Sequence, residues 1–235
     1  MEIDLVTLYS KIQNCTICPK MDNFKVLRNI DSVDANTKVF ILSQALAEKQ
    51  LRFSGVNFFK EDGKVGDTGR LLERFLNQFG QTIYPPSEIK LSNGNVIQSK
   101  QNQEYNTVYN TEITQCYPGK ATSKGDRIPD KEEIQNCVNT GFLYSEISII
   151  KPKIMLLMGK ISTQTFFEHI LKKPNKLSLT DLINQIIVDK KIPEVEFYGN
   201  KIAYLPIQHA SGLNPNFQKM CTNEKLILLI KDYLK

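Results

Sequence analysis

Short apolar runs alternate with amphipathic stretches along the 235-residue chain. Runs rich in apolar or β-forming residues predict buried strands at residues 38–44, 107–116, 153–159 and 201–206. Apolar residues at helical spacing predict helices at residues 68–79, 162–171 and 223–234. A further helix is expected at residues 130–149, because it follows Pro129 and opens with acidic residues. Strands that alternate with helices predict one α/β domain, a three-layer fold with a four-stranded parallel sheet and helices on both faces.

Two segments interrupt this alternation. Residues 89–105 are polar and rich in Asn and Gln, and Asn93-Gly94 is typical of a hairpin turn. Residues 174–196 form a second candidate insertion. In a parallel sheet of this kind, ligands bind beyond the carboxyl ends of the strands, so we look for chemistry there.

The charge is mildly basic, with a formal net charge of +5. This suits a nucleic-acid partner, although many other proteins share it. Lys outnumbers Arg, which favours contact with the phosphate backbone over reading of bases. No apolar run approaches the roughly 18 residues that a membrane span needs, and the N-terminus has acidic residues where a signal peptide would be basic. We expect a soluble, cytoplasmic monomer.

The chain has five cysteines, and an odd number argues against a disulfide framework. Cys15 and Cys18 form a C-x-x-C pair, whereas Cys116 and Cys137 come singly. Four thiolates can hold either zinc or an iron–sulfur cluster, and the asymmetric spacing favours the cluster. The alternative for Cys116 and Cys137 is that they are small buried apolar residues.

Three segments together resemble the iron–sulfur branch of the uracil-DNA glycosylase superfamily. They are residues 108–119 (VYNTEITQCYPG), 127–137 (RIPDKEEIQNC) and 151–160 (KPKIMLLMGK). The resemblance runs from residue 15 to about residue 215. It implies a DNA glycosylase with a structural 4Fe-4S cluster, with Cys221 as a spare thiol. The implied ligands of the cluster are Cys15, Cys18, Cys116 and Cys137.

A glycosylase must take its target base out of the DNA stack before it can reach the sugar. Residues 54–59 (SGVNFF) resemble the family's G-x-P-F, whose Phe stacks on the flipped base. Phe58 matches that Phe, with Phe59 as the alternative if the loop shifts, and core packing is the other interpretation of both. Gly69 and Arg70 match the start of a family helix that could bind DNA phosphate.

Two further segments carry implied roles. Residues 43–47 (SQALA) resemble Gly-Glu-Ala-Pro-Gly, so Gln44 matches a catalytic and base-binding Glu, and Ala45 stands where some branches place a water-activating Asp. Residues 208–215 (QHASGLNP) resemble the "HPS" motif. By that resemblance His209 stabilises the charge on the departing base, whereas His169 is structural or exposed. Ser211 would contact a flanking phosphate, and Leu213 would fill the space that the base leaves.

The second strand departs from the uracil-specific members, which carry an Asn where this chain has Glu112. An ionised carboxylate only accepts hydrogen bonds, so it would repel O4 of uracil and could accept from N4 of cytosine. We therefore expect a flipped pyrimidine that is a modified cytosine or uracil. Two alternatives stay open: a protonated Glu112 could bind uracil, or Asn110 could read the base.

No Lys is clearly placed for Schiff-base chemistry, which predicts a monofunctional enzyme that leaves an abasic site. The expected partner is DNA, in base-excision repair or anti-phage defence. The rival prediction is a non-catalytic nucleic-acid-binding protein that retains the fold and cluster.

Overall fold

Four parallel strands form the centre of the fold, with a fifth, antiparallel strand at one edge. The computed structural model describes residues 4–18, 20, 29–45, 55–100, 104–122 and 125–235. The strand order is β10-β11-β9-β1-β6. The strands are β1 (Val39–Ala45), β6 (Tyr109–Thr114), β9 (Ile154–Met158), β10 (Glu194–Phe197) and β11 (Asn200–Ile207). The prediction of a helix-covered parallel sheet is confirmed, and the four predicted strands match within a few residues.

The predicted count of four strands is wrong, because β10 pairs antiparallel with β11. Strand β10 is joined to β11 by a two-residue turn at Tyr198 and Gly199, which both have positive φ (47° and 75°). Turns of this kind match the twist of an antiparallel pair. The sequence pattern of β10 is weak because it is an edge strand whose residues are only partly buried. The preceding helix α7 (Leu179–Asp189) also lies inside the segment expected to be an insertion.

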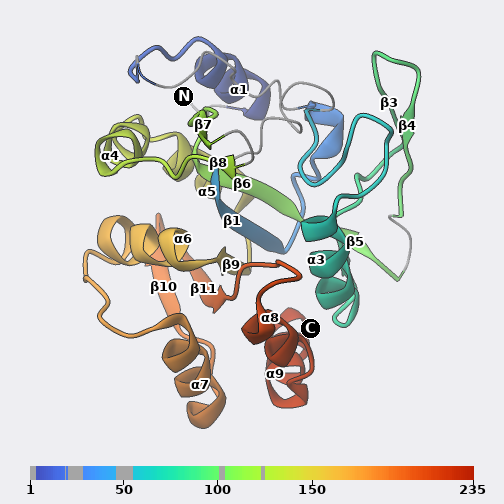
Figure 1. Ribbon diagram of the computed structural model, residues 1–235. Helices are drawn as coiled ribbons and strands as arrows, with labels where there is room; N and C mark the ends of the chain where they lie inside the picture. The colour runs from blue at the N-terminus through green and yellow to red at the C-terminus, as the bar shows by residue number, and fades with distance from the viewer. Residues whose placement is uncertain (1–3, 19, 21–28, 46–54, 101–103, 123–124) are drawn as a thin grey trace.

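Alternate residues of the strands lie in two apolar cores, one on each face of the sheet, as expected for a sheet that is covered on both faces. Ile41 and Leu156 face the first core, whereas Phe40 and Leu157 face the second. The first core is covered by α3 (Asp67–Asn77), α7, α8 (Pro215–Cys221) and α9 (Glu224–Leu234). The second is covered by α1 (Leu5–Gln13) and α5 (Phe142–Ile150). Figure 1 shows these helices on either side of the sheet.

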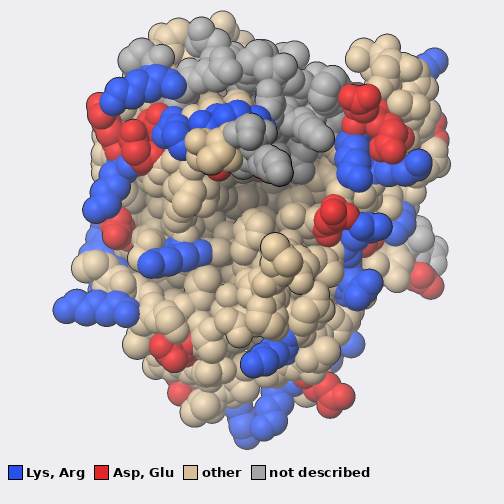
Figure 2. Space-filling model, in the orientation of Figure 1, with Lys and Arg blue, Asp and Glu red and all other residues tan. Residues whose placement is uncertain are grey.

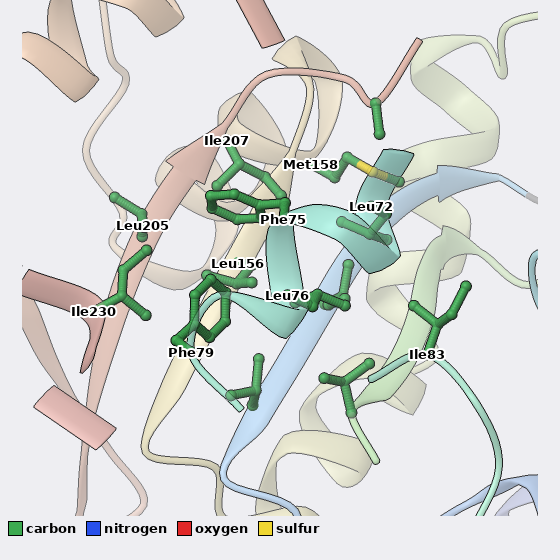
Figure 3. Close-up of a cluster of buried hydrophobic side chains, with 14 of the residues drawn as sticks. Leu72, Phe75, Leu76, Phe79, Ile83, Leu156, Met158, Leu205, Ile207 and Ile230 are labelled. Carbon is green, nitrogen blue, oxygen red and sulfur yellow. The ribbon is translucent and has the colours of Figure 1, made fainter. Parts of the chain in front are cut away.

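Helix α3 provides one side of the first core (Figure 3). Leu72, Phe75 and Leu76 recur at helical spacing and are fully buried against the strands. Burial of such side chains contributes roughly 1.5–3 kcal/mol each. Because α3 follows the segment that carries Phe58, this packing fixes one wall of the region predicted to bind the base.

Two predicted helices are divided in the structure. The helix expected at residues 130–149 is two helices, α4 (Lys131–Asn139) and α5, because Gly141 has a φ of 75° and ends the first. The predicted start is confirmed, since Asp130 and Glu133 form a capping box. The helix expected at residues 162–171 is α6 (Lys160–Thr165), followed by the π-helical turn η2 (Phe166–Ile170).

Short strands surround the main sheet. Strands β3 (Ile89–Lys90) and β4 (Val96–Ile97) form an antiparallel hairpin, as the Asn93-Gly94 pair predicts, and Gly94 has a φ of 85°. The others are β2 (Gln81–Thr82), β5 (Asn106–Thr107), β7 (Lys120–Thr122) and β8 (Gly125–Asp126), together with the short helix η1 (Ile30–Ser32).

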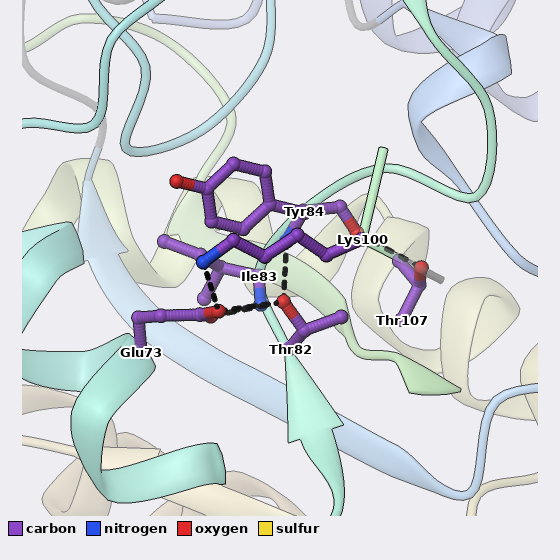
Figure 4. A network of polar contacts seen from close by, with 6 residues as sticks. All are labelled: Glu73, Thr82, Ile83, Tyr84, Lys100 and Thr107. Carbon is purple, nitrogen blue, oxygen red and sulfur yellow. Dashed lines mark hydrogen bonds and ion pairs between the residues drawn. The ribbon is translucent and has the colours of Figure 1, made fainter. Parts of the chain in front are cut away.

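The hairpin segment is tied to α3 through the buried carboxylate of Glu73 (Figure 4). Glu73 accepts hydrogen bonds from the Thr82 hydroxyl and the Ile83 backbone N–H, and it pairs with Lys100 at 3.3 Å. Lys100 also lies 4.0 Å from the centre of the Tyr84 ring. The polar insertion is therefore anchored to the core of the domain.

Among the described residues, no helix combines the length and the apolar character that crossing a membrane requires.

Candidate active site

The carboxyl ends of neighbouring parallel strands bring the predicted site residues to one edge of the sheet. Ser43 of β1 lies opposite Glu112 of β6. On the other side of β9, strand β11 ends at Ile207, immediately before the segment with His209. The connection from β11 to α8 crosses the middle of Figure 1. Figure 2, from the same side, shows a hollow near this connection with Lys and Arg side chains around it.

Glu112 is at the centre of a cluster of polar side chains, and only 2% of its surface is exposed. Its Oε1 atom accepts hydrogen bonds from Nδ2 of Asn57 and from Nδ2 of Asn110, each at 3.0 Å. The Ser43 hydroxyl donates to Oδ1 of Asn110 at 3.2 Å. We call these four residues the Glu112 cluster. Since both ends of the Asn110 amide contact the protein, the cluster favours Glu112 over Asn110 as the residue that reads a base.

Phe58 lies next to this cluster and is largely buried, with 7% of its surface exposed. Together with Asn57 and Asn110 it lines a small cavity of about 30 Å³. Its φ of 70° is unusual for a residue with a side chain. Phe59 is fully buried and packs edge-to-face on Tyr84, which favours Phe58 over Phe59 as the residue that stacks on a base.

Gly69 allows Phe58 to pack closely against the first turn of α3. A Cβ atom at Gly69 would lie 2.7 Å from Cβ of Phe58 and 2.6 Å from Cγ1 of Val65. Gly69 is thus a close-packing position, and its predicted contact with DNA stays a prediction. Arg70 is exposed and forms an ion pair with Asp67 of the same helix.

His209 lies just beyond the end of β11, against the end of β9. If residue 159 had a side chain in place of Gly159, its Cβ atom would lie 3.8 Å from Cβ and 3.9 Å from Cδ2 of His209. The residue is exposed overall, yet the surrounding protein partly shields the ring, and this desolvation lowers the pKa of His209 from its ordinary value. The imidazole is therefore mainly neutral at pH 7. Among the described residues, none forms a hydrogen bond with the imidazole ring.

The loop after His209 presents an apolar side chain to solvent. Leu213 is 95% exposed, the highest value among the large exposed hydrophobic residues. The loop is held by hydrogen bonds from the Leu213 N–H to the Ser211 hydroxyl and from the Asn214 amide to the His209 carbonyl. Asn214 also caps α8. An apolar side chain on a braced loop has the form expected of a residue that enters the DNA stack.

Gln44 is half-buried near the end of β1, and its carbonyl accepts a hydrogen bond from the Thr114 hydroxyl at 3.3 Å. The structure thus places Gln44 one residue beyond Ser43 of the Glu112 cluster. The last two residues of the motif at 43–47 are Leu46 and Ala47, and they lie outside the described residues, as does Ser54.

The four predicted cluster ligands come from separate elements. Cys15 and Cys18 follow α1, Cys116 follows β6, and Cys137 lies in α4. All four are half-buried, and none is in a disulfide. Cys18 receives a side-chain hydrogen bond from Asn136, beside Cys137.

The pKa of Cys137 is affected by the other three predicted ligands. Burial raises the pKa of Cys137 to about 12, and the charges of the other three predicted ligands also raise it. A hydrogen bond to its sulfur from the Gln115 N–H, at 3.4 Å, acts in the opposite direction. Cys221, the last residue of α8, has a pKa raised to about 11 by its own burial. In the part of the chain that is described, no three His, Cys, Asp or Glu residues are arranged to hold a single metal ion.

Two residues that sequence analysis did not identify contribute to the site. Asn57 stands where the G-x-P-F pattern has Pro. A polar residue at that position was the one sign in the sequence that Asn57 belongs to the site. Gly159 lies beside His209, and its φ of 88° is a backbone conformation that favours glycine. A separate cavity of about 600 Å³, between α7 and β11, is lined by residues that include Phe167, Ile186 and Tyr204 and by none of the predicted site residues.

Replacing Gly69 with Ala is expected to lower the free energy of unfolding by about 1–3 kcal/mol, because the added methyl group would overlap Phe58 and Val65. Urea unfolding followed by circular dichroism measures this. Gly212→Ala is the matched control, because a Cβ there meets no atom within 4 Å. Equal unfolding midpoints for the two variants would contradict the close packing inferred at Gly69.

Comparison with known proteins identifies the family. A search of curated proteins found no match to this chain. The family model described as the Uracil DNA glycosylase superfamily matches residues 30–235. The match includes Glu112, His209 and two of the predicted cluster ligands, Cys116 and Cys137. The other two, Cys15 and Cys18, precede it. The chain belongs to the uracil DNA glycosylase superfamily.

Proposed function

We propose that this protein is a monofunctional DNA glycosylase that excises a cytosine-type base carrying a modification at C5. Membership of the superfamily supports glycosylase activity on DNA. The observation that carries the choice of base is the buried Glu112 carboxylate, held by amide donors from Asn57 and Asn110.

The choice follows from matching donors to acceptors in a buried site. A carboxylate accepts hydrogen bonds, and at C4 cytosine has an amino group that donates, whereas uracil has an oxygen that accepts. A carboxylate that faced O4 of uracil would leave this buried O4 without a hydrogen-bond donor, at a cost of about 1–3 kcal/mol or more. Uracil is therefore the disfavoured base.

The requirement for a modification follows from the presence of cytosine in all DNA. An enzyme that removed ordinary cytosine would damage the host genome. Modified cytosines of the kind found in phage DNA provide a substrate that spares the host. We therefore place the activity in anti-phage defence, with base-excision repair as the other role consistent with this chemistry.

In the proposed reaction, the flipped base stacks on Phe58, and Glu112 and Gln44 bind its polar edge. The N-glycosidic bond breaks with its electron pair going to the base. Water adds to the sugar carbon as a hydroxyl group, and the proton that it loses neutralises the released base. The neutral His209 imidazole donates its N–H to the departing anion, in the manner of a fixed oxyanion-stabilising group. Leu213 occupies the gap in the stack, and Ser211, Gly69 and Arg70 contact the DNA backbone.

We also propose that Cys15, Cys18, Cys116 and Cys137 hold a 4Fe-4S cluster. The effect of the other three thiols on the pKa of Cys137, and an N–H donor to its sulfur, support this proposal, since hydrogen bonds to cluster sulfurs are common. When bound, the cluster would supply structural support, joining the segment after α1 to the end of β6 and to α4.

The base specificity is tested with oligonucleotides that contain uracil, hypoxanthine, cytosine or a 5-modified cytosine. We expect the wild type to release the modified cytosine, and Glu112→Asn to shift activity toward uracil because its amide can donate as well as accept. Abasic sites are detected as alkali-labile breaks. Glu196→Gln, which removes an exposed carboxylate from β10, is the control. Release of uracil alone by the wild type would overturn the cytosine assignment.

Replacing His209 with Ala is expected to reduce the rate of abasic-site formation by roughly 10²–10³-fold, as loss of one charge-stabilising donor does elsewhere. Single-turnover kinetics measures this, and His169→Ala, in the π-helical turn, is the control. A wild type that binds these oligonucleotides but forms no abasic site with any of them would instead indicate a non-catalytic nucleic-acid-binding protein.

Protein purified without oxygen is expected to contain about four iron atoms per chain. The cluster should give the protein an absorption band at about 400 nm. Cys137→Ser should lose most of both signals, because it removes one of the four proposed ligands. Cys221→Ser should keep them, because its thiol is not among those that affect Cys137. Stoichiometric zinc in place of iron would rule the cluster out.

A further inference from the structure

We propose that Asn57 is a specificity-determining positioning residue, which together with Asn110 keeps Glu112 in the acceptor-only state that selects an amino group on the base. This inference rests on the proposed function. It adds that the selection depends on the donors behind the carboxylate as well as on Glu112 itself.

The two amides converge on a single atom. Nδ2 of Asn57 and Nδ2 of Asn110 are both 3.0 Å from Oε1 of Glu112, although residues 57 and 112 are far apart in the sequence. Hydrogen bonds donated to a carboxyl group stabilise its ionised form, which opposes the effect of burial. Both hydrogen bonds to Oε1 are stronger when Glu112 is a carboxylate than when it is a neutral acid, so the two amides together favour the ionised form.

The orientation of both amides is fixed by their surroundings. The Ser43 hydroxyl donates to Oδ1 of Asn110, which directs the nitrogen end of that amide toward Glu112. Asn57 lies between Val56 and Phe58, two buried residues. The backbone there is held by hydrogen bonds from Gly66 N–H to the Phe58 carbonyl, at 2.8 Å, and from Phe59 N–H to the Val56 carbonyl, at 3.4 Å.

The state of the carboxyl group decides which base fits. An ionised Glu112 accepts from an exocyclic amino group, whereas a protonated Glu112 has an O–H that could donate to O4 of uracil. A buried carboxylate that lost its donors would tend to take up a proton. Removing the amides should therefore relax the selection toward uracil even when Glu112 is unchanged.

The test compares Asn57→Asp with the wild type by measuring single-turnover rates on 5-modified cytosine and on uracil. Aspartate would place a second carboxyl group against Glu112, so that the two share a proton. The ratio of the two rates should fall about tenfold or more, which is the scale of discrimination by one base-edge contact. Asn110→Asp should act in the same direction, and Asn36→Asp, in an exposed turn, should leave the ratio unchanged.

A double-mutant comparison separates positioning from general damage to the fold. In a Glu112→Gln background, Asn57→Asp should have little further effect on the ratio, because the carboxylate through which it acts is gone. Equal loss of both rates in Asn57→Asp, or the same change in ratio in both backgrounds, would overturn the inference. Asn57→Ala, which adds no charge, provides a second variant whose ratio should fall less but in the same direction.

Failure of this inference is distinguishable from failure of the proposed function. A wild type that forms no abasic sites, or releases only uracil, refutes the proposed function. A wild type that prefers modified cytosine, with a ratio that Asn57→Asp leaves unchanged, refutes the role of Asn57 alone.

Discussion

Strand β6 carries one buried carboxylate, that of Glu112, and contacts another, that of Glu146. Each needs hydrogen-bond donors, and this need constrains the rest of the site. Alternate residues of the strand face opposite sides of the sheet. On one side Tyr109 and Thr111 donate to Glu146, which is fully buried. On the other side Glu112 accepts from its two amide neighbours. A shift of the strand by one residue would exchange these faces, separating Glu146 from Tyr109 and Thr111, and Glu112 from Asn57.

Gln115, just beyond β6, connects this strand to the cysteine region. Its backbone N–H donates to the Cys137 sulfur, while its side-chain amide donates to the Glu112 carbonyl at 2.8 Å. Helix α1, which precedes the first two cysteines, contacts the same network through a hydrogen bond of 2.9 Å between the hydroxyls of Tyr9 and Tyr109. The thiols and the proposed base-reading carboxylate therefore share their supports, so that order in one region stabilises the other.

Apolar patterning predicted the elements that are buried on both sides and failed for those that are not. The runs that became β1 and β9 are almost wholly apolar, whereas the edge strand β10 alternates weakly and was not recognised. The break between α4 and α5 depends on the positive φ of Gly141, which a single glycine in a helical pattern does not reveal. The sequence predicted where the parallel strands end. Because ligands bind beyond the carboxyl ends of such strands, it also predicted that Glu112 and His209 lie at the same edge of the sheet.

The contacts that give the site its chemistry were less predictable, because they join residues distant in the sequence. Phe58 and Phe59 are equivalent as apolar residues, and only the fold shows that the second is fully buried while the first lines the cavity beside Asn110. The sequence contains Glu112 but not its protonation state, on which the selected base depends. A change from Asn to Glu at this position would be unfavourable alone, because a buried carboxylate without donors destabilises the fold or takes up a proton. A pocket that selects an amino group thus requires at least two changes together, the carboxylate and the amides that hold it.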